Sequence, residues 1–131
     1  IGKPRASIRT AEAFAGLARQ RGGKVPDAGE EVFARWQKVL EEADALAALH
    51  LIRNDFLPVA TQMVPQVQTV LDMLLAEGAF AASLSGSGPS CFGLFGDEDS
   101  LERASRELSS RMPDVRWIKS ALAAEPALPA D

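Results

Sequence analysis

The chain has 131 residues, 47% of them apolar and 24% charged, which fits one compact domain and excludes a disordered or collagen-like chain. Fourteen Lys and Arg against eighteen Asp and Glu leave a net charge of -4. Without a basic excess, and because Gly, Ser and Pro interrupt the longest uncharged stretch at residues 78–96, we expect neither nucleic acid nor a membrane as a partner. The single cysteine, Cys91, excludes an internal disulfide, and a cytoplasmic location is the default.

The two ends of the chain suggest its extent. Residue 1 is an isoleucine in a segment without the features of a signal peptide, so we expect the chain to be the C-terminal portion of a longer protein. Residues 123–131 are rich in Ala and Pro and lack a packing pattern. We therefore predict one domain over residues 1–122 and a disordered tail over residues 123–131.

The first half of the chain is predicted to hold one short strand and several helices. Thr10 is suited to cap the first helix, and Pro58 suits the first turn of another. Gly78 is a natural helix stop. The periods of apolar residues predict a strand over residues 6–9 and helices over residues 11–19, over residues 30–50, from Pro58, and from Pro65 to Gly78.

The last third of the chain changes to strand spacing. Apolar and small residues alternate over residues 80–84, and a second strand is expected over residues 91–95. A helix with one apolar face should follow Asp97, and residues 115–119 should form a final strand. The order strand, helices, strand, strand, helix, strand predicts an α+β fold of the ferredoxin-like split βαβ type, with extra helices inserted in its first half.

A glycine-rich segment between the two expected strands is the most specific motif. Its residues Ser85, Gly86, Ser87 and Gly88 combine flexible backbone with hydroxyl donors, and several N–H groups there could converge on an anion. No Gly-Lys-Ser/Thr follows, and a strand stands where a dinucleotide-binding motif needs a helix. The alternative is a glycine-rich hairpin loop that binds no ligand.

Thr10 and Phe14 form a second candidate site. They are four residues apart, so they share one face of the expected helix, where a hydroxyl and an aromatic ring could hold a flat polar ring such as a base. The alternative is that Thr10 only caps the helix and Phe14 only fills the core. The cluster at residues 53–55, taken alone, indicates a capped helix junction.

Other reactive residues favour structural roles. His50 has no Cys or second His at ligand spacing, which favours a structural histidine over a metal ligand. Cys91 lies within an expected strand and should be a small buried hydrophobe. A nucleophile with a complete acid/base pair is missing from the sequence, so we predict no catalytic residue and no metal site in this chain.

The residues at 84–95 resemble the third, glycine-rich motif of the GHMP superfamily of small-molecule kinases. With the segments at residues 7–14 and 53–60, they look most like the family of 4-diphosphocytidyl-2-C-methyl-D-erythritol kinases, which use ATP to phosphorylate the 2-hydroxyl of their substrate in non-mevalonate isoprenoid synthesis. This resemblance implies that Thr10 and Phe14 bind the cytidine end of the substrate. It also implies that Gly86, Ser87 and Gly88 belong to a loop that lies near the substrate phosphates.

The resemblance further implies partners and cofactors. ATP with Mg²⁺ would be bound mainly by an N-terminal domain that carries the catalytic residues and is absent from this chain. The chain alone should then be inactive and should self-associate as a homodimer through surfaces that this domain covers. The alternatives are another GHMP kinase, such as a homoserine or mevalonate-type enzyme, or a non-catalytic ferredoxin-like module for ligand binding or dimerisation.

Overall fold

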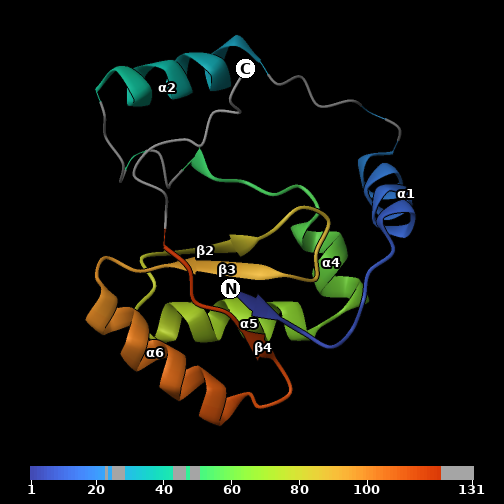
Figure 1. Cartoon of the computed structure of the whole chain (residues 1–131). Coiled ribbons are helices and arrows are strands. Elements are labelled where there is room, and N and C mark those ends of the chain that lie inside the picture. Colours follow the sequence, from blue (N-terminus) through green and yellow to red (C-terminus); the bar gives the residue numbers. More distant parts are fainter. Residues whose placement is uncertain (23, 25–28, 43–46, 48–50, 122–131) are drawn as a thin grey trace, which may run out of the picture.

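The computed structural model describes residues 1–22, 24, 29–42, 47 and 51–121, and the structural statements below concern these residues. Within them, four helices lie between the first two strands, and one helix lies between the last two (Figure 1). The elements are β1 (Gly2–Lys3), α1 (Thr10–Arg21), α2 (Glu30–Glu41), α4 (Leu57–Met63), α5 (Gln66–Ala76), β2 (Ala81–Leu84), β3 (Cys91–Leu94), α6 (Glu98–Arg111) and β4 (Arg116–Trp117).

The strands form one four-stranded antiparallel sheet in the order β2-β3-β1-β4. Gly2 is central to it, because it pairs with Cys91 of β3 on one side and with Trp117 of β4 on the other. The hairpin of β2 and β3 pairs Ala81 with Leu94 and Leu84 with Cys91. This strand order, with α1 to α5 between β1 and β2, confirms the predicted split βαβ fold and its inserted helices.

The core lies where α5 and α6 pack against the sheet. Helix α5 runs along β2 and β3, and α6 packs beside β4 and against α5 (Figure 1). Helix α6 begins at Asp97, whose side chain accepts a hydrogen bond from the Ser100 N–H at 2.7 Å, and this bond lowers the pKa of Asp97. The predicted apolar faces are confirmed, since the two helices bury Val67, Val70, Leu71, Leu74, Ala104 and Leu108.

The first strand was expected at residues 6–9, and that expectation is wrong. The strand is β1, and the chain leaves the sheet at Pro4. Because β1 lies between two partners, each further residue would need its backbone N–H for the sheet, and proline has none. The segment at residues 5–9 instead crosses to α1, with Ile8 buried in the core on the way.

Helix α2 covers the first part of the helix expected over residues 30–50, but it contributes nothing to the core. None of its residues is buried, and Phe33 and Leu40 expose 71% and 70% of their surface. Figure 1 shows α2 above the sheet and apart from it. The remainder of the expected helix includes His50, which lies outside the described residues, as does the tail predicted over residues 123–131.

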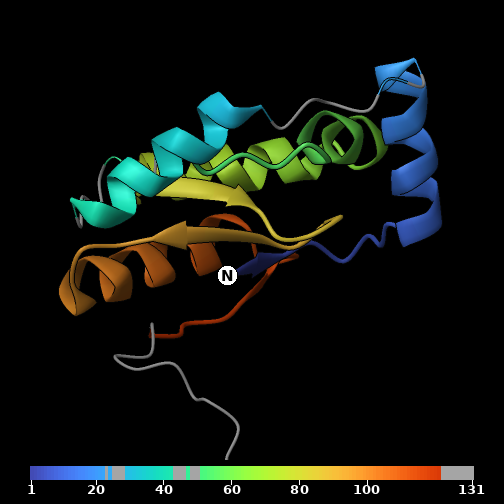
Figure 2. The same cartoon turned by 90° about the horizontal axis from the view of Figure 1, so that it is seen from above.

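At the opposite end of the sheet from the start of α6, helices α1 and α4 lie side by side (Figures 1 and 2). A Cβ atom placed on Gly16 of α1 would lie 2.6 Å from Cγ1 of Val59 in α4, so only glycine permits this approach. No helix in the described part of the chain is long and apolar enough to cross a membrane.

Candidate functional site

The glycine-rich segment forms the connection between β2 and β3. Its backbone closes on itself: the Ser85 N–H donates to the Ser90 carbonyl at 2.8 Å, and the Gly88 N–H donates to the Ser85 carbonyl at 3.1 Å. Gly86 and Gly88 have φ angles of 58° and 82°, in the left-handed region that favours glycine. The predicted hairpin loop and the need for its glycines are therefore confirmed.

Gly88 also allows the loop to pack closely against the core. A Cβ atom at this position would lie 3.0 Å from Leu84 Cδ1 and 3.4 Å from both Ala60 Cβ and Ile8 Cδ1. A Cβ atom on Gly86, in contrast, would have no neighbour within 4 Å. Gly88 is thus needed both for its positive φ angle and for close packing, whereas Gly86 is needed only for its positive φ angle.

The loop offers two backbone donors. Within the described part of the chain, the N–H groups of Gly86 and Ser87 have no hydrogen-bond partner, and Gly86 is exposed. Backbone N–H groups gathered in a tight loop are suitable ligands for an anionic oxygen. Anion binding by residues 85–88 remains a prediction that this geometry permits.

Thr10 lies beside the loop, as the first helical residue of α1. Its Oγ1 atom is 3.5 Å from Oγ of Ser87, 77 residues further along the chain. The N-cap of α1 is Arg9, and no side chain caps the helix, so the interpretation of Thr10 as a helix cap is wrong. Its hydroxyl instead lies within hydrogen-bond distance of the loop.

Phe14 lies on the same face of α1, one turn further on. It exposes 57% of its surface, and its ring meets the ring of Phe56 edge to face, with centroids 4.9 Å apart and an angle of 77° between the planes. The interpretation of Phe14 as a core residue is therefore wrong. The edge contact on Phe56 leaves much of the Phe14 ring open to a ligand.

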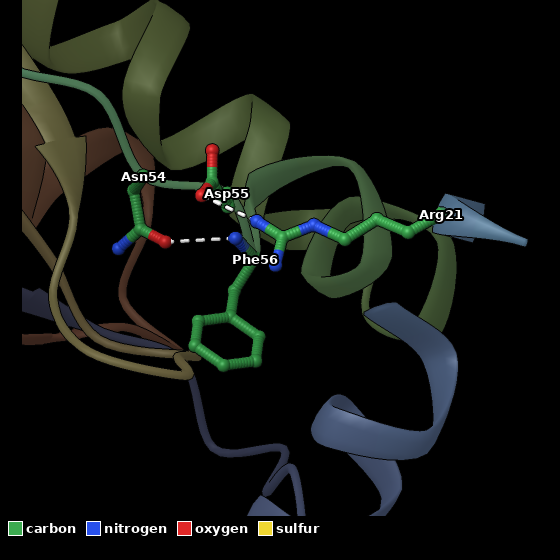
Figure 3. A network of polar contacts seen from close by, with 4 residues as sticks. All are labelled: Arg21, Asn54, Asp55 and Phe56. Carbon is green, nitrogen blue, oxygen red and sulfur yellow. Dashed lines mark hydrogen bonds and ion pairs between the residues drawn. The ribbon is translucent and has the colours of Figure 1, made fainter. Parts of the chain in front are cut away.

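Asn54 is a residue of this site that the sequence reasoning missed. Its Nδ2 atom donates to the carbonyl oxygens of Leu84 at 2.8 Å and Gly86 at 2.9 Å. Its Oδ1 atom accepts from the Phe56 N–H at 2.9 Å, the bond that Figure 3 shows. The interpretation of this cluster as a capped helix junction captures the bond to Phe56 and omits the two to the loop. The signal was an asparagine two residues before an aromatic one, which is too common to indicate long-range partners.

Arg21 fixes the other end of α1 to the same segment. Its guanidinium Nη2 lies 2.5 Å from Oδ2 of Asp55, and Figure 3 shows it reaching the segment from the side opposite to Asn54. Helix α1 is thus held at three levels: Thr10 lies against the β2–β3 loop, Gly16 packs against Val59 of α4, and Arg21 pairs with Asp55 just before α4. These contacts fix the position of α1, which carries Phe14.

The chemistry of this site is that of recognition. It combines an open aromatic ring, two hydroxyls and free backbone N–H groups, and Asp55, its nearby carboxylate, is paired with Arg21. Cys91 is fully buried, which confirms the prediction of a small buried hydrophobe, and burial raises the pKa of its thiol to about 11. Over the described ranges, no three His, Cys, Asp or Glu side chains gather where they could hold a metal ion.

Comparison with known sequences identifies the class of protein. Residues 37–114, which include the glycine-rich loop and Asn54, match the family model described as GHMP kinases C terminal. The match covers more than half of the chain, so the chain belongs to the GHMP kinase C-terminal family. Thr10 and Phe14 lie outside the matched residues.

Individual relatives allow a more specific comparison than the family model does. The chain is 36% identical over 108 residues to a protein of Brucella abortus, 43% identical over 96 residues to one of Rhizorhabdus wittichii, and 30% identical over 126 residues to one of a Chelativorans species. Each of these proteins is named 4-diphosphocytidyl-2-C-methyl-D-erythritol kinase. The three alignments cover 82%, 70% and 96% of this chain but only 33%, 33% and 40% of the relatives, so the chain spans about a third of their length.

Proposed function

We propose that this chain is the substrate-side, C-terminal domain of a 4-diphosphocytidyl-2-C-methyl-D-erythritol kinase, which transfers a phosphoryl group from ATP to the 2-hydroxyl of that substrate. The observation that carries the proposal is that an exposed aromatic ring, Phe14, and a glycine-rich anion loop share one surface, joined through Thr10 and Ser87. The relatives that carry this name align with most of the chain and support the same assignment.

The two parts of the surface suit the two parts of a cytidyl diphosphate compound. The open face of Phe14 can stack on a pyrimidine, and the hydroxyls of Thr10 and Ser87 can donate to polar groups of the nucleoside or its phosphates. The N–H groups of Gly86 and Ser87 suit the phosphate oxygens, because a backbone donor costs no side-chain entropy when it binds. This division of roles depends on α1 remaining against the loop.

ATP and Mg²⁺ belong to another part of the enzyme in this proposal. The described residues gather no carboxylates that fit a divalent cation, so we derive no step of the reaction through Mg²⁺ in this chain. The domain of residues 1–122 instead forms one wall of the substrate cleft. Alone, the chain should show no phosphoryl transfer.

Another GHMP kinase, acting on homoserine or a mevalonate-type alcohol, is the nearest alternative. Such a substrate carries no aromatic ring and gives the exposed Phe14 nothing to stack on. A free-standing ligand-binding or dimerisation module is less favoured, because the relatives that cover this chain are named as kinases.

The test is a coupled ADP-release assay on the full-length protein, with the cytidyl substrate, homoserine and mevalonate offered separately. We expect turnover with the cytidyl substrate and not with homoserine or mevalonate. We expect no turnover with any of the three when the present 131 residues replace the full-length protein. In parallel, CDP titrated into the present chain should shift the amide signals of Thr10, Phe14 and Gly86. Turnover with homoserine or mevalonate in place of the cytidyl substrate would overturn the proposal.

A further inference from the structure

Asn54 joins the two halves of the candidate site with one side chain. Its carboxamide holds Leu84 at the end of β2, Gly86 in the loop, and Phe56 at the start of α4. We propose that Asn54 is a positioning residue, which sets the glycine-rich loop at a fixed place relative to the Phe14–Phe56 aromatic pair. Its effect on substrate binding rests on the proposed function, whereas its effect on the loop does not.

The bonding pattern at this position requires a carboxamide. Two of the partners are carbonyl oxygens, which need donors, and the third is an N–H group, which needs an acceptor. A carboxylate in place of the amide keeps an acceptor for Phe56 but turns an oxygen toward two carbonyl oxygens. Serine is too short to reach the loop and Phe56 together, and alanine makes none of the three bonds.

The bond to Gly86 also directs a donor of the loop. The carbonyl of Gly86 and the N–H of Ser87 belong to one planar trans peptide, so they point in opposite directions. When Asn54 holds that carbonyl, the Ser87 N–H must point away from Asn54. This N–H is one of the two loop donors without a partner in the described structure. Asn54 therefore fixes the orientation of a group that the proposed substrate phosphates would contact.

The same side chain fixes the aromatic half. Its bond to the Phe56 N–H holds the first residues of α4, and the Phe56 ring supports Phe14 by its edge contact of 4.9 Å between centroids. The neighbouring Asp55 bonds to Arg21 and not to the loop, so it supplies a matched control. Substitution of Asp55 removes the ion pair with Arg21 that Figure 3 shows, and leaves the two loop bonds of Asn54 in place.

Native-state hydrogen exchange of the present chain tests the role without any ligand. Asn54→Asp should speed exchange of the Ser85 and Gly88 amides by about tenfold or more, because their loop bonds lose the support of two hydrogen bonds. The Phe56 amide should stay protected in Asn54→Asp, which keeps an acceptor, and lose protection in Asn54→Ala. Asp55→Asn should leave the loop amides unchanged.

Two outcomes would overturn the positioning role. One is unchanged exchange of the loop amides in Asn54→Asp. The other is an equal rise at the Leu74 amide of α5, since that would show Asn54 to support the whole fold and not the loop. Both results are read without substrate, so they stand even if the kinase proposal fails.

Kinetics of the full-length kinase then separate binding from stability. Asn54→Asp should raise the KM of the cytidyl substrate by about tenfold, with a smaller change in kcat, because a misplaced loop donor weakens binding of the substrate. Glu77→Gln, which removes an ion pair with Arg111 outside the site, should leave this KM within about twofold. An unchanged KM in Asn54→Asp, alongside faster loop exchange, would overturn the inference that the loop position serves the substrate.

Discussion

Helices α5 and α2 carry the same kind of sequence pattern and have opposite fates. Both show apolar residues at helical spacing, yet α5 buries Val67, Val70, Leu71 and Leu74 whereas α2 buries no residue. The difference lies in their neighbours, since α5 packs along β2 and β3 and α2 lies apart from the sheet (Figure 1). A helical period therefore predicts a helix with an apolar side but does not indicate what covers that side.

The candidate site contains both buried and exposed positions. Gly88 is packed on core residues, but Phe14 one turn into α1 exposes most of its ring. The site thus combines a covered region, which gives rigidity, with an uncovered region, which in our proposal contacts the ligand. Substitutions that compare buried and exposed positions of the same residue type test this division.

The largest effect on stability is expected when a buried leucine, and not an exposed one, is replaced by alanine. Leu74→Ala in α5 should lower the free energy of unfolding by about 2–5 kcal/mol, because Leu74 is only 2% exposed and its loss leaves a cavity against the sheet. Leu40→Ala in α2 should change it by less than about 0.5 kcal/mol. Urea unfolding of the two variants measures both values, and similar losses would show that α2 is covered in solution.

The next effect concerns two of the exposed phenylalanines, Phe14 and Phe80. In the full-length kinase, Phe14→Ala should raise the KM of the cytidyl substrate about five- to hundredfold, since a base–aromatic stack contributes about 1–3 kcal/mol. Phe80→Ala, just before β2, removes a ring that is 50% exposed and lies outside the site, so KM should not change. If Phe14→Ala lowers the melting temperature by several degrees and leaves KM unchanged, the stacking role is excluded.

The two loop glycines should separate by their packing. Alanine at either position is strained by about 1–2 kcal/mol, because both φ angles are positive. Gly88→Ala should cost more than Gly86→Ala, because its methyl group would press on Leu84 at 3.0 Å, whereas Gly86 has open space around it. Thermal unfolding checks the order, and equal losses would mean that the loop is not seated on the core.

A smaller effect should appear at alkaline pH through Cys91. Burial raises its pKa from 9.0 to about 11, so the folded protein favours the neutral thiol. The stabilisation is complete below pH 9, where the unfolded thiol is also neutral, and is lost as the pH rises toward 11. Between those pH values the melting temperature of the wild type should fall faster than that of Cys91→Ala, and parallel curves would contradict the burial.

The smallest effect concerns self-association of the chain. The exposed Phe33 and Leu40 of α2 add to the apolar surface, and we expect weak, concentration-dependent dimerisation of the isolated domain. Sedimentation velocity over a range of concentrations should show the average mass to rise, and to rise less in Leu40→Ser. A wild-type chain that stays monomeric throughout would remove this expectation.

Much of the fold could be predicted because its signals are local. Pro58 and Asp97 mark helix starts, Gly78 follows a helix end, and the change from helical to strand spacing after it gave the order of the last elements. The expected strand at residues 6–9 failed because the local pattern does not include the pairing that β1 makes with Trp117, more than a hundred residues away.

The sequence by itself determined the α+β class, the order of the elements, the glycine-rich hairpin loop and the resemblance to GHMP kinases, since each depends on residues close together in the chain. The tertiary structure alone decided that Thr10 faces Ser87, that Phe14 is exposed against Phe56, and that Asn54 holds the loop. These contacts join residues from 30 to 77 positions apart in the chain. Their physical basis is the packing of α1 and α4 at the end of the sheet, which no local period or cap in the sequence encodes.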